Sequence, residues 1–237
     1  MKLYTYCLVE DLDAFDATTR GISGAAVRSL QIDELAVLVT DFNADTVAVT
    51  RENALDHAAV VRSVLDRTTP LPFRFGTLVT EQQLRSYISA RKPALQTRFA
   101  HVRGCVEMSV KIIREVSDED KTEVRDEITS GTSFLEEKRR ELLGTKQKTI
   151  EASKIETWLR EQVDGLVRDE QVTMRPSEKL VLAAAHLVER DKIPQYREKM
   201  TAARKNRREL HFLFSGPWPP YSFANIELEF KTQFGVS

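Results

Sequence analysis

The run from Pro70 to Thr80, PLPFRFGTLVT, constrains the fold of this chain more than any other stretch. Pro70 and Pro72 fix their own φ angles and favour an extended entry. The apolar residues that follow are of the type found in strands, and Gly76 can adopt backbone angles that other residues avoid. Thr80 and Gln83 have capping-box spacing, so a helix is expected to begin directly after the run. The run therefore predicts an extended segment joined to a helix with almost no loop.

Arg74 lies inside this apolar run, between Phe73 and Phe75. One interpretation is an arginine that snorkels to solvent at a strand edge. The other is a buried or half-buried arginine that holds a carboxylate or a carbonyl. The sequence leaves both interpretations open.

Length and charge exclude several classes of protein. The chain has 237 residues, 41% of them hydrophobic, and a net charge of −1. That length suits two small domains, and the near-neutral charge argues against a protein dedicated to nucleic acid or anionic membranes. No run approaches the roughly 18 to 20 apolar residues that a membrane span needs. Cys7 and Cys105 form no metal-binding motif and suit a reducing cytoplasm, and the first residues do not resemble a signal peptide.

Residues 1–104 predict a small α+β domain, a sheet with two helices. The expected strands are 3–9, 27–32 and 35–40, and the expected helices are 50–67 and 81–102. Thr50 is expected to cap the first helix. The apolar stripe of that helix is expected to be Leu55, Ala58, Val61 and Leu65. Pro93 is expected to kink or split the second helix, and Gly104 to end it.

Two features of this half have competing interpretations. Gly21-Ile22-Ser23-Gly24 can cradle a phosphate, but it lacks the lysine of a P-loop and the GxGxxG spacing, which favours a plain glycine turn. His57 lies beside the apolar stripe and can act as a general base. No nucleophile is near it in sequence, which favours a structural histidine.

Residues 105–215 predict a second domain with the split βαβ order of a ferredoxin-like fold, βαββαβ. The expected elements are strand 105–113, helix 133–167, strands 170–175 and 179–189, helix 194–208 and strand 210–214. For the run 180–188 a helix is the alternative, because Ala183-Ala184-Ala185 favours helix. Residues 115–127 carry seven acids against two bases. Such a run can be a partner-binding acidic loop, but a solvated mobile loop is favoured. Residues 197–208 carry six bases and one acid. A basic helix can bind nucleic acid, but without interleaved aromatic residues a solvated face is favoured.

Residues 216–237 form a C-terminal tail that is expected to pack back on the domains. Its segment GPWPPY, residues 216–221, has few conformations open to it and is expected to be extended. It can be a ligand for a proline-reading module, but packing on its own protein is favoured. In that interpretation Trp218, Tyr221 and Phe223 fill a seam between the domains.

Several stretches together resemble the gas vesicle protein F/L family (GvpF/GvpL). They are Tyr4-Thr5-Tyr6, Gly21-Ile22-Ser23-Gly24, Glu52-Asn53-Ala54-Leu55-Asp56-His57, Pro70-Leu71-Pro72-Phe73-Arg74-Phe75-Gly76-Thr77, Arg103-Gly104-Cys105-Val106-Glu107-Met108, Phe134-Leu135-Glu136-Glu137-Lys138 and Gly216-Pro217-Trp218-Pro219-Pro220-Tyr221-Ser222-Phe223. Their order covers nearly the whole chain, and LPFRFGT and GPWPPYSF are the most specific. The resemblance does not separate the F branch from the L branch.

The resemblance implies a two-domain α+β protein that is not an enzyme and uses no cofactor. It implies an accessory or minor component of gas vesicles, in the cytoplasm, that binds the hydrophobic shell protein GvpA or other accessory proteins. Because the run from Pro70 to Thr80 is apolar and bordered by proline, the first domain is expected to carry the shell-protein surface. The candidate contact residues are Phe73, Arg74, Phe75 and Gly76.

The main alternative is a regulatory module whose ferredoxin-like domain senses a small ligand. An enzyme requires a constellation of catalytic groups. The four histidines are scattered, and neither metal-binding spacing nor a Gly-x-Ser-x-Gly elbow is present.

Overall fold

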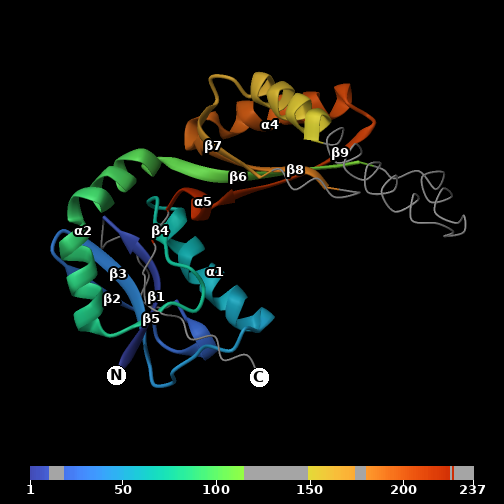
Figure 1. The fold of residues 1–237 in the computed structure, drawn as a ribbon. Helices are drawn as coiled ribbons and strands as arrows, with labels where there is room; N and C mark the ends of the chain where they lie inside the picture. Colours follow the sequence, from blue (N-terminus) through green and yellow to red (C-terminus); the bar gives the residue numbers. More distant parts are fainter. Residues whose placement is uncertain (11–18, 115–148, 174–179, 225, 227–237) are drawn as a thin grey trace, which may run out of the picture. The chain divides into compact units, whose positions relative to one another are not determined.

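The structure is a computed structural model that describes residues 1–10, 19–114, 149–173, 180–224 and 226. The chain forms two compact units. Unit 1 consists of Met1–Glu107 together with Pro217–Ser237, and unit 2 of Met108–Gly216. Each unit combines helices with one antiparallel sheet, which confirms the predicted α+β class (Figure 1). That the second domain has a ferredoxin-like fold stays a prediction.

The sheet of unit 1 is built around two long neighbouring strands. Its order is β2-β3-β1-β4, with β5 also paired to β1. The strands are β1 (Lys2–Val9), β2 (Arg28–Ile32), β3 (Leu35–Phe42), β4 (Leu71–Pro72) and β5 (Leu78–Val79). The hairpin between β2 and β3 turns at Asp33 and Glu34, as the sequence predicts. Figure 1 shows this sheet between α1 (Arg51–Leu65) and α2 (Glu81–Val102).

Both helices begin where the sequence predicts a cap. The Asn53 N–H donates to Thr50 Oγ1, and the Gln83 N–H donates to Thr80 Oγ1. The Gln83 side chain accepts from the Thr80 N–H at 2.8 Å, which completes the capping box. α2 continues through Pro93 without a break, and Figure 1 shows it bending along its length, as expected of a helix with an internal proline.

The predicted apolar stripe of α1 is wrong for two of its four residues. Leu55 is 58% exposed and Ala58 is exposed as well. The buried face consists of His57, Val60, Val61, Val64 and Leu65. Both stripes contain apolar residues, and the face with three valines buries more apolar area than the face with Ala58. His57 therefore lies inside the buried face rather than beside it.

A bulge in β1 sets which of its residues face α1. The pairing with β3 shifts between Thr5 and Cys7, so Tyr6 is the extra residue. As a result Tyr4, Tyr6 and Cys7 all belong to one core cluster with the valines of α1. A regular strand would turn Tyr6 and Cys7 to opposite faces.

The sequence predicts one extended segment from Pro70 to Thr80, and this prediction is wrong. Its two ends pair with β1 as β4 and β5, at Cys7 with Pro72 and at Leu3 with Val79. Between them the chain turns over residues 73–77, and the two end residues of this turn still hydrogen-bond to β1, through the Phe73 N–H and the Thr77 carbonyl. The prediction fails here because Gly76 has a φ of 83°, which ends an extended backbone.

The glycine turn Gly21–Gly24 closes over Tyr6. The Ile22 N–H donates to Tyr6 Oη at 2.9 Å, and the Ser23 N–H donates to Asp56 Oδ2 at 3.2 Å. These N–H groups would be the donors of a phosphate cradle, and both already have a partner inside the protein. The arrangement supports the interpretation as a structural turn.

Unit 2 contains a four-stranded sheet in the order β7-β8-β6-β9. Its described elements are β6 (Cys105–Arg114), a helix over residues 149–162, β7 (Val167–Thr173), β8 (Leu180–Glu189), α4 (Ile193–Asn206) and β9 (Leu210–Trp218). The first helix ends at residue 162, five residues before its predicted end at residue 167, because a turn at 163–166 leads into β7. The predicted start of this helix at Ser133 and the acidic run 115–127 lie outside the described residues. β9 extends to Trp218, past the expected end at residue 214.

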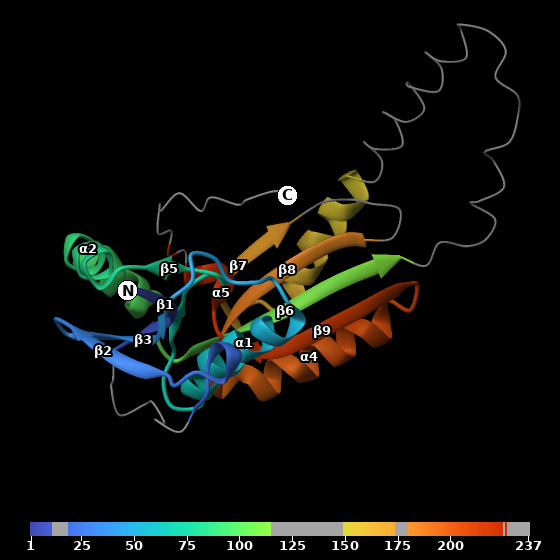
Figure 2. The same ribbon diagram turned by 90° about the horizontal axis from the view of Figure 1, so that it is seen from below.

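Side chains of the two helices pack against the strands of unit 2. The Trp158 ring lies 5.9 Å from the Phe212 ring of β9. His186 of β8 is buried, and its Nδ1 lies 2.8 Å from Tyr196 Oη of α4. Burial lowers the pKa of His186 to about 4, with the Glu170 charge acting in the opposite direction. Figure 2 shows α4 running beside β9.

We expect Gly21→Ala to destabilise the protein by about 3 kcal/mol. A Cβ at this position would lie 1.9 Å from Tyr6 Oη and 2.9 Å from Val27 Cγ2, so the turn or the tyrosine must move. Gly24→Ala is the control: it has a φ of 72° but no atom within 4 Å of the added Cβ, so only backbone strain of about 1 kcal/mol is expected. Urea unfolding of both variants checks this, and equal losses would contradict the steric argument.

Candidate functional site

The turn at residues 73–77 presents the candidate contact residues predicted from the sequence. Its first residue, Phe73, is buried and its N–H donates to the Tyr6 carbonyl at 2.9 Å. The turn closes where the Thr77 N–H and hydroxyl both donate to the Arg74 carbonyl, at 3.2 and 2.6 Å. Four residues that follow one another in sequence therefore occupy different environments.

Arg74 is exposed, so the interpretation as a buried arginine is wrong. Phe75 and Gly76 are half-buried. Of the four predicted contact residues, Arg74 and Phe75 are accessible to a partner through their side chains. Phe73 is buried and supports the turn from inside the core.

A buried tyrosine and a buried histidine hold this turn in place. The Tyr4 hydroxyl lies 2.8 Å from His57 Nδ1, and the Gly76 N–H donates to Tyr4 Oη at 3.3 Å. Because the tyrosine oxygen accepts from Gly76, its single hydrogen is available for His57, and Nδ1 is the acceptor. The His57 ring also lies 5.9 Å from the Phe75 ring, edge to face. One cluster thus joins β1, α1 and the turn.

His57 itself is a neutral, structural side chain. It is 3% exposed. Burial lowers its pKa to about 4, and the Phe73 backbone acts weakly in the opposite direction. Its polar partner is a phenol whose own pKa burial raises, so no activated nucleophile is next to it. The contacts support the structural interpretation over the general base.

The C-terminal segment of unit 1 packs next to this cluster. Its short helix α5 (Tyr221–Ala224) contacts β4 and α2. Phe223 is buried, whereas Trp218 and Tyr221 are each 40% exposed. The Tyr221 ring lies 6.5 Å from the His57 ring, and the Arg62 guanidinium lies 5.5 Å from the centre of the Trp218 ring. A seam between domains for these three residues stays a prediction.

Glu107 anchors α5 and was not predicted from the sequence. Its carboxylate accepts from the Ser222 N–H at 2.7 Å and from the Ser222 hydroxyl at 2.9 Å. Burial raises the pKa of Glu107, and the two bonds from Ser222 lower it by less. The residues are 115 positions apart, so no local pattern could pair them.

We call Arg74, Phe75, Trp218 and Tyr221 the aromatic surface of unit 1. His57 connects Phe75 with Tyr221, and Trp218 stacks on another residue of the same helix. Tryptophan, tyrosine and arginine are the residue types that dominate binding energy at protein interfaces. The arrangement is suited to holding another polypeptide.

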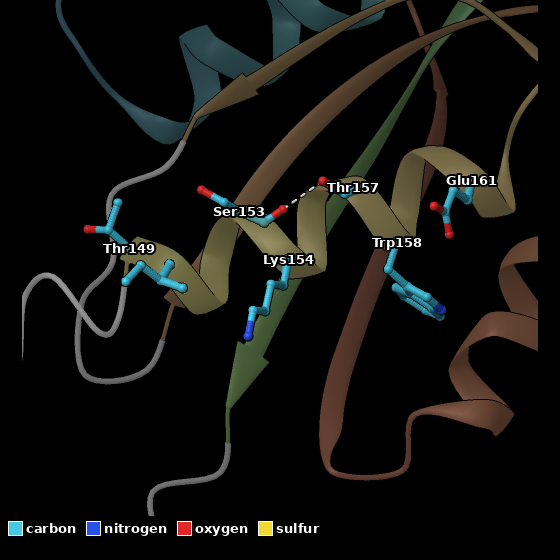
Figure 3. Close-up of a pocket in the computed structure, with 7 residues that line it drawn as sticks. Thr149, Ser153, Lys154, Thr157, Trp158 and Glu161 are labelled. Carbon is cyan, nitrogen blue, oxygen red and sulfur yellow. Dashed lines mark hydrogen bonds between the residues drawn. The ribbon is translucent and has the colours of Figure 1, made fainter.

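A second feature is an open pocket of about 520 Å³ in unit 2. Figure 3 shows side chains that line it, and all of them project from the helix over residues 149–162. They include Lys154, Trp158 and Glu161. A ligand site is typically lined by polar groups that converge from several elements. The described residues that line this pocket come from one helix.

Two further searches cover the described part of the chain. It contains no group of three or more His, Cys, Asp or Glu residues placed to hold a metal ion. None of its helices has the length and apolar character needed to cross a membrane.

Comparison with known proteins gives one consistent answer. The family described as "Gas vesicle synthesis protein GvpL/GvpF" matches residues 2–225. Gas vesicle protein F1 of Halobacterium salinarum is 23% identical, over 99% of this chain and 98% of its own length. Gas vesicle protein L2 of the same organism is 28% identical, over 93% and 90%. Gas vesicle protein F of Haloferax mediterranei is 25% identical, over 99% and 98%.

Two solved structures share the fold. The crystal structure of GvpF from Anabaena superposes with a TM-score of 0.75 at 20% identity, covering 95% of this chain and 97% of that one. GvpF from Microcystis aeruginosa gives a TM-score of 0.75 at 17% identity, covering 95% and 99%.

We expect the free energy of unfolding to fall as the pH is lowered from 6.5 towards 4. Folding holds the pKa of both His57 and His186 at about 4, whereas the unfolded chain takes up these protons near pH 6.5. Each histidine thus contributes up to about 3 kcal/mol above pH 6.5, which is lost progressively on acidification. Urea unfolding at pH 7.5 and 5 measures this loss.

His57→Gln is the control for this prediction. It removes one titrating group, so its stability should depend less steeply on pH than that of the wild type. The raised pKa of Glu107 acts with the opposite sign in both proteins, and the comparison cancels it. Parallel curves for the two proteins would contradict the assignment to His57.

We expect Glu107→Ala to release α5. The variant leaves the Ser222 N–H and hydroxyl without their acceptor, at a cost of about 1–3 kcal/mol. Hydrogen exchange should become faster at residues 217–224, ahead of global unfolding. Glu107→Gln keeps one oxygen acceptor and should lose less protection. Unchanged exchange in the alanine variant would show that α5 is held by its apolar contacts alone.

Proposed function

Because the chain belongs to the gas vesicle synthesis protein GvpL/GvpF family, we propose that it is an accessory or minor structural protein that binds the hydrophobic shell protein GvpA and supports gas vesicle assembly. The family match runs over residues 2–225, and relatives named gas vesicle protein F and L align over nearly their whole length. We place its action in the cytoplasm, at the growing gas vesicle. Other gas vesicle accessory proteins are further partners in this proposal.

The observation that carries the proposal is the aromatic surface of unit 1. Trp218 and Tyr221 are each 40% exposed, and Ser222, next to Tyr221, is fixed by its hydrogen bonds to Glu107. A rigid aromatic side chain gives a large contact area at a low cost in conformational entropy. An apolar shell subunit that has not yet been incorporated needs such a surface, because its own apolar faces aggregate in water.

The arrangement favours contact through side chains over strand addition in unit 1. At the β2 edge, the Arg85 guanidinium donates to the Gln31 carbonyl. At the β4 edge, Pro72 has no N–H to offer, and α5 contacts the strand. Charges, prolines and covering helices are the usual means of blocking a sheet edge. An amphipathic helix of the shell protein laid on an exposed apolar face is the mode that remains.

α1 offers such a face. Leu55 and Ala58 are exposed there. On the same side of the helix, the Arg62 guanidinium lies over the Trp218 ring. Residues at positions i, i+3 and i+7 form one continuous stripe. Two of the four residues that sequence patterning assigned to the core, Leu55 and Ala58, are therefore part of the surface that we propose for the partner.

Binding in this proposal is stoichiometric and needs no nucleotide. The glycine turn at residues 21–24 uses its N–H groups internally. The small-ligand alternative is not supported by the unit 2 pocket, whose described lining comes from one helix.

We expect the double variant Arg74→Glu/Trp218→Ala to retain at most about a tenth of the GvpA that the wild type retains. The measurement is co-purification of GvpA with tagged full-length protein from the same expression strain. Both residues are exposed, so the fold should survive. A thermal melt within a few degrees of wild type confirms that.

The matched control is Lys154→Glu/Ile150→Ala. It makes the same change of charge and truncates another exposed apolar side chain, both in unit 2, and it should retain GvpA as the wild type does. Equal retention by the two variants would refute the aromatic surface as the site. Failure of wild-type protein to retain any GvpA would refute the proposed function itself.

A further inference from the structure

The aromatic surface consists of two segments that are far apart in the sequence and meet at His57. The turn at residues 73–77 is held by Tyr4, whose hydroxyl lies 2.8 Å from His57 Nδ1 and accepts from the Gly76 N–H at 3.3 Å. In α5, the Tyr221 ring lies 6.5 Å from the same imidazole ring. A change in the charge of His57 therefore acts on both segments.

α5 is small, and its docking depends on contacts outside the helix. It has four residues, whereas an isolated helix needs roughly 12 to 15 residues to be even marginally stable in water. The Ser222 N–H and hydroxyl both donate to the Glu107 carboxylate, and Phe223 and Ala224 are buried. An element of this size can open locally at a lower cost in free energy than the unfolding of the whole unit.

The groups that pack around the His57 ring are uncharged. They are Tyr4 and Tyr6 of β1, Phe75 of the turn and Tyr221 of α5. Burial raises the pKa of all three tyrosines, so they stay neutral. Among the described residues, His57 Nε2 has no hydrogen-bond partner. A proton on His57 would therefore place a cation in an apolar site without a carboxylate to stabilise it.

Opening of α5 changes this environment. The Tyr221 ring then leaves the imidazole of His57, and water can reach it. Burial holds the pKa of His57 at about 4 while α5 is docked, against a weak opposite effect of the Phe73 backbone, whereas a solvated histidine titrates near 6.5. Protonation therefore favours the open state of α5, because that state binds the proton more tightly.

The same proton weakens the support of the turn at residues 73–77. Neutral His57 accepts from the Tyr4 hydroxyl at Nδ1, but a protonated imidazole has only donors. The Tyr4 oxygen then faces two donors, the His57 Nδ1–H and the Gly76 N–H, and the hydrogen of its own hydroxyl loses its acceptor. A buried donor without an acceptor costs free energy, so the turn is expected to loosen when α5 opens.

We propose that α5 is an acid-opened strap of the aromatic surface, which is closed while His57 is neutral and opens when His57 takes up a proton. The consequence for the partner rests on the proposed function: acid releases the shell protein, because Tyr221 and the turn that carries Arg74 and Phe75 lose their support together.

Glu107 acts against this opening. Burial raises the pKa of its carboxyl group, and the two bonds from Ser222 lower it by less. A proton on Glu107 therefore favours the closed state, in which the group is buried. Glu107→Gln removes this second titration and keeps an oxygen that can accept from Ser222, so this variant is the background in which the effect of His57 is measured.

The test is amide hydrogen exchange of the full-length Glu107→Gln protein at pH 7.5 and pH 5, corrected for intrinsic exchange rates. The amides of residues 221–224 report on α5, because all four donate hydrogen bonds in the folded unit. We expect the open fraction to rise by up to about 25-fold on acidification, from the two pKa values of His57. At both pH values these amides should be less protected than those of β3, which shows that α5 opens ahead of global unfolding.

Two histidine variants in the same background assign the effect. His57→Gln removes the buried imidazole, and the protection of residues 221–224 should then change less than about threefold with pH. His101→Gln is the matched control, because His101 is an exposed histidine of α2 in the same unit, and the full acid effect should remain. The Gly76 and Thr77 amides, which donate within the turn, should follow α5 in each variant.

Three outcomes overturn the proposal. They are protection of residues 221–224 that does not change with pH, an equal acid effect in the His57→Gln variant, and α5 amides that exchange only together with those of β3. If His57→Gln unfolds, Tyr221→Ala tests the same coupling from its other end. Titration of the His57 ring by NMR should then give a higher pKa than in the wild type, and an unchanged value would equally overturn the proposal.

These measurements contain no GvpA, so their outcome does not depend on whether the protein binds it. Retention of GvpA at pH 7.5 tests the proposed function separately. Where wild-type protein retains GvpA at pH 7.5, washing at pH 5 should release more of it from the wild type than from His57→Gln.

Discussion

The hydrogen bond between Tyr4 and His57 is the contact on which the rest of unit 1 depends. It joins the central strand to α1 at 2.8 Å inside the core. The same hydroxyl accepts from Gly76, and the same imidazole lies against Phe75 and Tyr221. A buried polar group that has lost its hydrogen-bond partner costs more free energy than the bond itself gains. The chain is thus committed to one arrangement of strand, helix, turn and α5.

This coupling explains why exposed aromatic residues can remain ordered. Trp218 and Tyr221 are on a short segment that would have little stability alone. Glu107, near the start of β6, holds the segment through its hydrogen bond with Ser222, and the His57 ring lies near Tyr221. A partner that contacts this surface then meets aromatic side chains on a backbone segment that is already fixed by Glu107. Such preorganisation increases affinity without any additional contact.

The sequence predicts what depends on neighbours along the chain. Caps at Thr50 and Thr80 and the hairpin at Asp33 and Glu34 are local patterns, and the structure confirms them. The α+β class follows from the order of such elements. Signals of this kind need only a few consecutive residues.

What the sequence could not supply depends on distant residues. Tyr6 and Cys7 face the same way because of a bulge that is defined by pairing with β3. His57 joins the core because Tyr4 offers it a hydroxyl, and this choice turns Leu55 outward. Glu107 and Ser222 are brought together by the fold alone. In each case a polar or irregular contact decides between two apolar patterns that are equally good locally.

The chemistry of the aromatic surface has a consequence for how the proposed partner is held. Contacts of this surface remove apolar area from water and change little with ionic strength. Apolar contacts act only after docking, so they set the lifetime of the complex and not the rate of encounter. A protein that must capture an aggregation-prone subunit and later release it can therefore be adjusted for release through these few aromatic side chains.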